Sequence, residues 1–454
     1  MSDDTSRRDF LKGTAATLGA AALRPPAVDA GLQPRATTGL APDTLLFSAP
    51  PLDRVRVGFV GVGGMGTVHL ENYLALDGVE VVAICDIDPS HAERGRQKVV
   101  AAGQKSPTLY TKGVRDFERM CGEESLDLVF TATPWEWHVP VMLEALKTGK
   151  HGATEVPAAY RVDDCWALVE AAEKYHKHCV MMENCCYDRR EMLAFMLVRK
   201  GILGELLHAE CGYLHDLRGI KFSKEGEGLW RRAHAVKRNG NLYPTHGLGP
   251  VAQCFDINRG NQFEYLVSMS SPSRGLRLWN DEKLPADDPR KKEVYKLGDV
   301  NVSLIKTVKG QTIYLINNTD DPRPYSRINE VQGTKGLLSG WPDRIHIEGR
   351  SPNDEWETLD KYYEEYEHPL WKSEKAKKAT RGHGGMDFLE DYRFIECLRA
   401  GVPADMNVYD AAALSVVCDL TERSVADRSR PQDFPDFTRG KWKTTAPLGI
   451  VGSE

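Results

Sequence analysis

A glycine-rich run near residue 60 is the first part of the chain whose spacing predicts chemistry. Residues 61–66 read G-V-G-G-M-G, which fits the pattern G-x-G-x-x-G, and they follow an apolar stretch at 55–60. In this pattern Gly61 makes a tight turn, Gly63 lets the backbone approach a pyrophosphate, and Gly66 allows close packing of helix on strand. Free N–H groups at the start of the following helix attract phosphates. The run therefore predicts a dinucleotide site.

An acidic residue in the right place narrows the choice of dinucleotide. Residues 79–85 read as a second apolar strand, and Asp86 stands at its end, about 20 residues after the last glycine of the run. A carboxylate there accepts hydrogen bonds from a ribose diol and repels a 2′-phosphate. We therefore expect NAD(H) rather than NADP(H) as the cofactor.

The residues best suited to proton transfer lie in the segment 241–250, N-L-Y-P-T-H-G-L-G-P. The segment contains His246, and a histidine side chain suits proton transfer. Tyr243 belongs to the same short proline-containing segment, so both side chains could face one pocket. Tyr187 and Tyr213 follow the ends of predicted strands and could donate to an oxyanion or hold hydroxyl groups. This segment is therefore the candidate centre for acid–base chemistry.

Alternating strands and helices must position the dinucleotide site. Further strands are predicted at 126–131, 151–154 and 180–183, with helices at 67–76, 139–148 and 162–176. The segment 132–138, A-T-P-W-E-W-H, is predicted as a loop at the carboxyl end of a strand, where ligands bind in such sheets. This order predicts an α/β Rossmann domain with a parallel sheet over residues 54–187.

The pattern changes after about residue 187. Stretches of alternating apolar residues at 206–213, 264–270, 300–308, 312–317, 328–333 and 344–348 predict a mostly antiparallel, open sheet. Helices are predicted at 190–199, 386–399 and 408–426. Residues 188–454 are therefore expected to form an α+β substrate domain, whose C-terminal helices could pack back on the Rossmann domain. The charged segment 354–378 is expected to be solvated or to lie in an interface.

The N-terminus carries an export pattern. S-R-R-D-F-L-K at 6–12 precedes a mildly apolar, Ala/Gly-rich stretch, which is typical of a twin-arginine signal. We assign residues 1–30 to this signal, with A-V-D-A at 27–30 as a candidate cleavage site, and residues 31–53 to a linker. The expected partner is the twin-arginine export machinery, and the expected location is the periplasm or the medium.

Composition excludes several other classes of protein. With 59 Lys+Arg against 65 Asp+Glu the net charge is −6, so a strongly basic nucleic-acid binder is excluded. No apolar run is long enough for a polytopic membrane protein. The 10 cysteines lack paired zinc spacing and are too sparse for a disulfide scaffold, so most should be buried small hydrophobic residues. No residue cluster predicts a catalytic metal.

Three segments, at 133–138, 183–187 and 241–250, resemble glycoside hydrolase family 109, the NAD-dependent α-N-acetylgalactosaminidases. The wider order of a Rossmann half, an A-T-P-x-x-x-H loop, an E-x-P tripeptide and an antiparallel sheet is similar to the glucose–fructose oxidoreductase / inositol dehydrogenase family. The resemblance covers the chain from Arg54 to its C-terminus. Dehydrogenases of the wider family usually have Glu-Lys-Pro, where the lysine helps to move a proton. Here Val156 replaces that lysine, as in the hydrolases, and it cannot do acid–base work.

The resemblance implies an unusual hydrolysis of the glycoside. Ordinary glycosidases use two carboxylates that flank the scissile bond. In an NAD-dependent glycosidase, hydride passes from C3 of the sugar to NAD⁺, a base removes the acidified C2 proton, and the aglycone leaves C1. Water then adds, and the hydride returns. The net redox change is zero, so the cofactor can stay bound.

The resemblance also assigns residues to roles. The cofactor set implied is Gly61, Gly63, Gly64, Met65, Gly66, Asp86, Trp135, Glu136, Trp137, His138, Glu155, Val156 and Asn184. The sugar-contacting set implied is Tyr213, Arg231, Tyr243, Pro244, Thr245, His246 and Tyr325. The candidate catalytic residues are His246, Tyr187 and Tyr325, and the choice of C2 base stays open among these, Tyr213 and Tyr243.

The predicted activity is hydrolysis of terminal α-linked N-acetylgalactosamine from a glycan. The alternative is an exported NAD-dependent sugar or cyclitol oxidoreductase, which the same Rossmann half would support; a non-catalytic sugar-binding protein is a third reading. The wider family also implies pairing of sheet domains into a homo-oligomer. The sequence does not identify the natural glycan or its aglycone.

Overall fold

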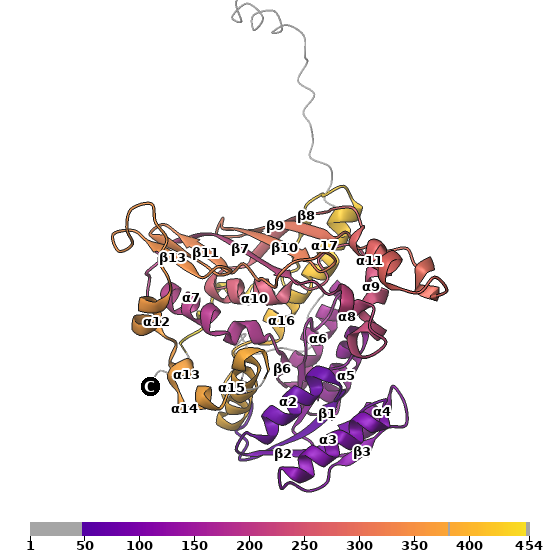
Figure 1. The fold of residues 1–454 in the computed structure, drawn as a ribbon. Coiled ribbons are helices and arrows are strands. Elements are labelled where there is room, and N and C mark those ends of the chain that lie inside the picture. The colour runs from indigo at the N-terminus through magenta and orange to yellow at the C-terminus, as the bar shows by residue number, and fades with distance from the viewer. Residues whose placement is uncertain (1–47, 380–381, 451–454) are drawn as a thin grey trace, which may run out of the picture. The chain divides into compact units, whose positions relative to one another are not determined.

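The computed structural model describes residues 48–379 and 382–450 of the 454-residue chain. The predicted signal at 1–30 and most of the predicted linker at 31–53 lie outside the described residues. The described part contains two β-sheets, with helices packed against them (Figure 1).

The first sheet has six parallel strands in the order β3-β2-β1-β4-β5-β6. The strands are β1 (Val55–Val60), β2 (Val79–Cys85), β3 (Thr108–Tyr110), β4 (Leu128–Thr131), β5 (His151–Thr154) and β6 (Cys179–Met181). They read as short apolar runs because both faces of a parallel sheet are buried under helices. This strand order confirms the predicted Rossmann fold, and ligands bind where the order reverses, between β1 and β4.

The helices of this sheet are α2 (Gly64–Leu74), α3 (Pro89–Ala101), α4 (Asp116–Glu123), α5 (Trp135–Lys147) and α6 (Val162–Tyr175). Two of them, α2 and α5, begin earlier than the sequence indicated, and α6 begins where it was predicted. The expectation that 132–138 is all loop was wrong, since α5 starts at Trp135 with Pro134 as its N-cap residue. The fixed φ of proline suits the entry to a helix. The free N–H groups of α2 and α5 consequently lie at the carboxyl edge of the sheet.

The second sheet has eight strands in the order β13-β12-β11-β7-β10-β9-β8-β14. The strands are β7 (Leu206–Leu214), β8 (Phe263–Ser270), β9 (Val300–Thr307), β10 (Thr312–Asn318), β11 (Glu330–Gly333), β12 (Gly336–Ser339), β13 (Arg344–Ile347) and β14 (Gln432–Asp433). Every pairing in this sheet is antiparallel except that of β7 with β10. The mostly antiparallel sheet is therefore confirmed, and its alternating burial fits a sheet covered on one face.

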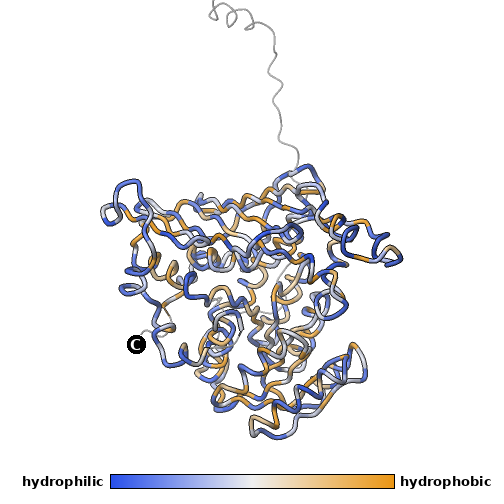
Figure 2. The backbone as a smooth tube through the Cα atoms, in the orientation of Figure 1, coloured by the Kyte–Doolittle hydropathy of each residue, from blue (hydrophilic) through white to orange (hydrophobic). Residues whose placement is uncertain are grey.

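Helices that follow the six-stranded sheet in the sequence lie between the two sheets (Figure 1). They are α7 (Arg189–Arg199), α10 (Thr245–Cys254), α15 (Met386–Ala400), α16 (Val408–Ser415) and α17 (Val417–Ala426). Helix α10 packs on β7 and α17 on β8, while α15 contacts α2 and α16 contacts α6. The stretch predicted as one helix at 408–426 is divided at Val416 into α16 and α17. Hydrophobic segments concentrate along these inner elements, and hydrophilic ones along outer loops (Figure 2).

The charged segment 354–378 is more ordered than expected. It contains α12 (Asp360–Tyr366), α13 (Pro369–Lys372) and α14 (Glu374–Lys378). Tyr362 is fully buried rather than solvated, and its hydroxyl donates to Glu357 at 3.0 Å. The segment therefore contributes a core side chain despite its many charges. Smaller helices are α8 (Arg218–Lys221), α9 (Arg231–Lys237) and α11 (Gly275–Lys283).

All ten cysteines are buried, as the sequence predicted for most of them, and all ten are unpaired. Burial raises the pKa of most of these thiols, for example that of Cys179 to about 12, so they act as small apolar side chains. Among the described residues, no helix is both long and apolar enough to cross a membrane.

The buried ion pair between Arg259 and Asp410 gives a test of the packing of α16. Arg259 Nη1 and Nη2 lie 2.8 and 2.7 Å from the two carboxylate oxygens. Removal of Arg259 leaves the buried Asp410 carboxylate without its counter-ion, so Arg259→Met should lower the free energy of unfolding by about 3 kcal/mol. Denaturant titration measures this. The double variant Arg259→Met/Asp410→Asn should recover part of the loss; a silent single variant would contradict the expectation.

Candidate active site

The glycine-rich loop at the end of β1 has the geometry that a dinucleotide needs. Gly61 has φ +80°, and a Cβ there would lie 2.9 Å from the carbonyl oxygen of Ala132. A Cβ on Gly66 would overlap the carbonyl oxygen of Gly61. At Gly64, by contrast, a Cβ meets no atom within 4 Å, so the outer face of the loop is open. Met65 follows within the first turn of α2.

Asp86 lies at the end of β2 beside this loop, nearly buried. Its Oδ2 accepts from the N–H of Val62 at 2.8 Å, and its Oδ1 accepts from the N–H of Asp88 at 2.8 Å. Each carboxylate oxygen can accept one further hydrogen bond. The residues at this edge of the sheet therefore fit the phosphates and a ribose diol of NAD.

Glu155, just after β5, is held by a buried histidine. His69 Nε2 lies 2.8 Å from Glu155 Oε1, and His69 Nδ1 lies 2.9 Å from Asp391. Although burial opposes it, the two carboxylates raise the pKa of His69 well above its usual range, so the ring stays charged. His69 in turn lowers the pKa of Glu155 against the effect of burial. The neighbouring Val156 is buried and apolar, so Glu155 is the ionisable residue of this tripeptide.

A second buried carboxylate of α15 holds the turn after β6. Asn184 begins the 3-10 helix η2 (Asn184–Tyr187), and its Nδ2 donates to Asp387 Oδ1 at 2.6 Å. The other oxygen of Asp387 lies 2.9 Å from His383 Nδ1. Sequence analysis did not single out His69, Asp387 or Asp391, because His69 and Asp391 are 322 residues apart, and Asn184 and Asp387 are 203 residues apart.

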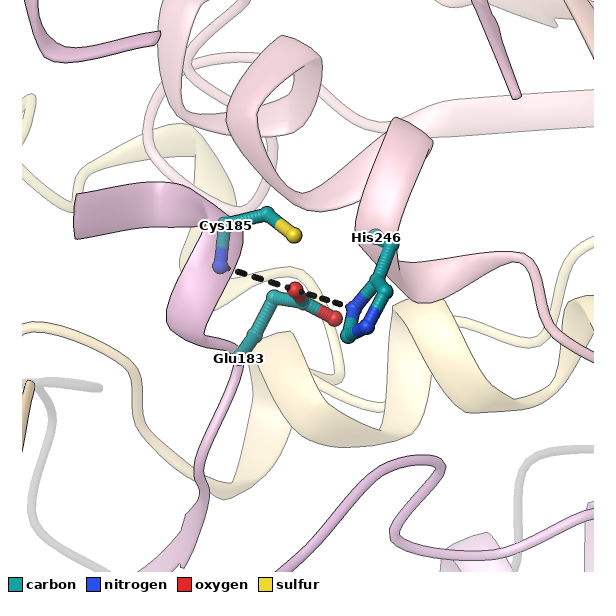
Figure 3. A group of neighbouring side chains, drawn as sticks. All are labelled: Glu183, Cys185 and His246. Carbon is teal, nitrogen blue, oxygen red and sulfur yellow. Dashed lines mark hydrogen bonds and ion pairs between the residues drawn. The ribbon is translucent and has the colours of Figure 1, made fainter. Parts of the chain in front are cut away.

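His246 stands in a histidine–carboxylate pair with Glu183. Figure 3 shows Glu183 between Cys185 and His246, with Oε1 at 3.2 Å from the N–H of Cys185 and 2.7 Å from His246 Nδ1. Glu183 is 1% exposed, so its charge is desolvated. A carboxylate at Nδ1 fixes the ring so that Nε2 is left with its lone pair, which is the form that accepts a proton. Glu183 lies in the E-N-C-C-Y segment, but its role needed the fold.

The same three residues bring an oxygen, a sulfur and a nitrogen within 4.8 Å of one another, the spacing of a metal-ligand set. A cysteine binds metal as the thiolate. Burial raises the pKa of Cys185 well above its usual range, so the thiol stays protonated. The hydrogen bonds of Glu183 with Cys185 and His246 therefore explain why these three residues lie together.

Aromatic rings and one arginine surround His246. The ring of Tyr243 lies 4.8 Å from His246 and 4.6 Å from Tyr213, and it stacks on Trp135 at 5.9 Å. Arg231 places its guanidinium 5.0 Å from the Tyr243 ring centroid and 5.2 Å from that of Trp135. Since Trp135 opens α5, this cluster joins the carboxyl edge of the Rossmann sheet to the second sheet. Burial raises the pKa of Tyr213 to about 12, so it stays a neutral donor.

Tyr325 completes the opposite side of the cluster. Its ring lies 6.1 Å from Tyr213 and 5.1 Å from His215, and its hydroxyl accepts from Arg327 Nη1 at 2.9 Å. Arg327 is itself fixed by ion pairs with Asp188 and Glu191. Burial keeps the Tyr325 hydroxyl protonated by raising its pKa. His215 was not singled out in the sequence, although it lies just beyond β7.

Several predicted site residues lie elsewhere or serve the scaffold. The hydroxyl of Tyr187 donates to Asp405 at 3.1 Å, inside a packed region near Arg393, so Tyr187 does not join the His246 cluster. Both ring nitrogens of His138 lie 2.8 Å from backbone carbonyl oxygens, those of Pro157 and Thr133. The remaining five are placed as follows: Gly63 is the N-cap residue of α2, Trp137 packs on Phe117, Glu136 faces His234, Pro244 is the N-cap residue of α10, and Thr245 is fully buried.

Comparison with known proteins accounts for both halves of this site. Residues 55–183 match an oxidoreductase family with an NAD-binding Rossmann fold, and residues 187–444 match the C-terminal domain of glycosyl hydrolase 109. The chain belongs to glycoside hydrolase family 109. Residues 4–23 match the twin-arginine translocation signal sequence, so the chain carries the signal for that export route.

Curated members of family 109 resemble this chain over its length. A glycosyl hydrolase family 109 protein of Solibacter usitatus is 48% identical over 450 residues, covering 98% of this chain and 100% of its own. One from Shewanella pealeana is 46% identical over 457 residues, with 99% of each chain covered. The predicted family is thus confirmed, and the chain is a glycoside hydrolase that uses NAD.

Solved structures with the same fold are oxidoreductases. An NAD-binding oxidoreductase from Klebsiella pneumoniae has a TM-score of 0.66 at 16% identity, covering 84% of this chain and 99% of its own. Levoglucosan dehydrogenase in complex with NADH and levoglucosan has a TM-score of 0.64 at 18% identity, covering 84% and 100%. At such identities the likeness shows the shared fold.

Two glycines give a matched test of the NAD site, one in the loop and one outside it. Gly66→Ala should lower the NAD content of purified protein by about tenfold or more, which is ~1.4 kcal/mol of binding, because the new Cβ overlaps the Gly61 carbonyl. Gly122→Ala, on α4, should keep its NAD, since the added Cβ meets open space away from the loop. Cofactor released by denaturation is quantified, with circular dichroism as the folding control. Equal NAD in both variants would show that the loop does not approach the cofactor closely.

The Glu183–His246 pair gives a second test. Glu183→Gln keeps the shape but removes the charge that orients and polarises the imidazole, so kcat should fall on the order of 10²–10⁴-fold. KM and NAD content should change little, because the substitution is isosteric. Glu264→Gln, on the exposed side of β8, is the matched control. A kcat within twofold of the parent would argue against His246 as a proton-transfer residue.

Proposed function

We propose that the protein, once exported, hydrolyses terminal α-linked N-acetylgalactosamine by transient oxidation at C3, elimination between C1 and C2, addition of water and re-reduction. The observation that carries this proposal is the hydrogen bond of His246 to the Glu183 carboxylate, in a cluster of neutral tyrosines at the NAD edge of the Rossmann sheet. The second part of the observation is the buried, apolar Val156 at the position where dehydrogenases keep a lysine. The choice of N-acetylgalactosamine rests on the family resemblance.

The carboxylates in and beside the His246 cluster are paired with basic side chains, which favours this route over direct displacement. A conventional glycosidase needs one carboxyl group as acid and another as nucleophile or base across the scissile bond. Among the described residues, Glu183 pairs with His246, Glu155 with His69, and Glu227 with Arg231. When bound, NAD supplies the acceptor for the C3 hydride and returns it at the end of the cycle.

The chain's own residues divide the remaining work. His246, oriented by Glu183, takes a proton from the sugar at Nε2. Tyr325, fixed by Arg327, and Tyr213 stay protonated and so can donate hydrogen bonds to an enolate oxygen. Arg231 and Tyr243 form a wall that orients the sugar ring. Tyr187, whose hydroxyl is bound to Asp405, does not enter the scheme.

The experiment is hydrolysis of an aryl α-N-acetylgalactosaminide by purified protein in D₂O with no NAD added. We expect free sugar carrying one deuterium at C2, because a base exchanges that proton during the cycle, and no net NADH absorbance. His246→Ala should retain NAD but release no sugar. Assay of periplasmic and medium fractions tests where the activity resides.

Other outcomes identify the alternatives. Net NADH from free sugar and added NAD⁺, without aglycone release, would make the protein a sugar or cyclitol oxidoreductase. Aglycone release without deuterium in the sugar would indicate direct displacement and would overturn the C2 elimination step.

A further inference from the structure

A cavity of about 570 Å³ lies beside the His246 cluster and has no role in the scheme above. Its lining comes from residues 229–238, which include α9, and from α17, the first turn of α5 and the two residues before α6 (Figure 1). The glycine-rich loop, Glu155 and His246 do not line it. Cavities that bind small molecules measure roughly 300–1,000 Å³, so this one has room for a sugar residue.

The lining holds three carboxylates, and each of them is already paired with a basic side chain. A paired carboxylate presents little net charge to a ligand, because its partner neutralises it. The pairs are Glu136 with His234, Glu422 with Arg238, and Asp419 with Arg423.

Two cationic side chains of the lining stay unpaired. Arg161 and Lys237 are exposed, and no ion pair of either is found among the residues that the structure describes. Arg238 adds a buried Nη1 for which the described part of the chain offers no hydrogen-bond partner. Guanidinium and ammonium groups make their strongest hydrogen bonds to oxyanions. The cavity is therefore suited to a ligand that carries a negative group.

The same cavity has aromatic and apolar faces. Tyr160 and Trp230 line it together with Leu229, which is 70% exposed. The guanidinium of Arg238 lies 4.5 Å from the centroid of the Tyr160 ring and holds that ring in place. One face of a sugar ring is made of C–H groups that pack on aromatic rings, while its hydroxyl groups bind polar side chains. These rings and the free cations together fit an acidic sugar better than a bare anion.

A single tryptophan joins this cavity to the sugar-contacting residues. The ring of Trp135 lies 5.0 Å from that of Trp230 and 4.8 Å from that of His234, both in the lining. The same ring stacks on Tyr243 at 5.9 Å and lies 5.2 Å from the guanidinium of Arg231. A ligand in the cavity is therefore one side chain away from the sugar in the proposed site.

We propose that this cavity binds an acidic saccharide, a uronic acid or a sulfated sugar, whose negative group contacts Arg161 and Lys237 and whose ring packs on Trp230 and Tyr160. The saccharide is either an acidic residue of the glycan from which the terminal sugar is removed or a separate acidic sugar. Binding itself is independent of the catalytic scheme, whereas assignment of the ligand to the substrate glycan rests on the function proposed above.

Calorimetric titration of the full-length, NAD-loaded protein with glucuronate tests the binding site. The double variant Arg161→Gln/Lys237→Gln should weaken binding by about tenfold or more, because two charged hydrogen bonds are lost. Added salt should also weaken binding to the parent protein. Lys105→Gln/Lys309→Gln removes the same charge from exposed lysines outside the cavity and should bind as the parent does. His246→Ala should also bind as the parent does, which excludes binding in the catalytic site.

Three results would overturn the proposal. One is the lack of any binding of glucuronate, and another is equal affinity in the parent and in the double variant Arg161→Gln/Lys237→Gln. The third is inorganic phosphate bound as tightly as glucuronate and weakened by the same variant, which would show a general anion site with no preference for a sugar.

Two matched disaccharides identify the source of the acidic sugar. In one, α-N-acetylgalactosamine is linked to glucuronate, and in the other it is linked to glucose. If the acid belongs to the substrate glycan, KM should be about tenfold lower for the acidic disaccharide, and Arg161→Gln/Lys237→Gln should abolish the difference. Equal KM values with intact glucuronate binding would assign the cavity to a separate acidic sugar. If neither disaccharide releases sugar, the proposed function fails, while the calorimetric titration still decides the binding site.

Discussion

Buried carboxylates on α15 are the constraint on which the site depends. Asp387, Glu390 and Asp391 are 0%, 3% and 0% exposed, although an unpaired buried charge costs several kcal/mol. Asp391 is paired with His69, and Asp387 with Asn184 and His383. Burial raises the pKa of Glu390 well above its usual range, so this group stays neutral. The helix can therefore dock only where these partners converge.

This docking links distant parts of the chain at one place. His69 and Asp391 are separated by 322 residues, and Asn184 and Asp387 by 203. Their hydrogen bonds tie α2 and η2 to the same C-terminal helix. The hydrogen bond with His69 fixes the position of Glu155, which follows β5. Because Val156 replaces the usual lysine, Glu155 carries the charge of the Glu-Val-Pro tripeptide, and the buried His69–Asp391 pair positions it.

How much the sequence predicts depends on the range of the interactions. The Rossmann strands and the strands at 206–213 and 300–308 follow from local apolar patterns, and Gly61, Gly66 and Asp86 follow from spacing alone. The start of α5 at Trp135 was missed because a helix that opens with tryptophans lacks the polar caps that mark most helices. Tyr187 lies apart from the His246 cluster, because its hydroxyl donates to Asp405, 218 residues away, and its place after a strand does not reveal that partner. Glu183 and His69 acquire their roles only from distant partners, His246 at 63 residues and Asp391 at 322 residues along the chain.

A hydride that leaves and returns within one turnover suits an enzyme that carries a twin-arginine signal. That route transports folded proteins, so a cofactor seated before export can stay in its loop, and the proposed cycle asks for no fresh NAD afterwards. The protein interior also agrees with folding before export. Its ten cysteines are buried and unpaired, so the fold is complete without disulfides. The histidine–carboxylate pairs around the site, His69 with Asp391 and His246 with Glu183, likewise form within one chain.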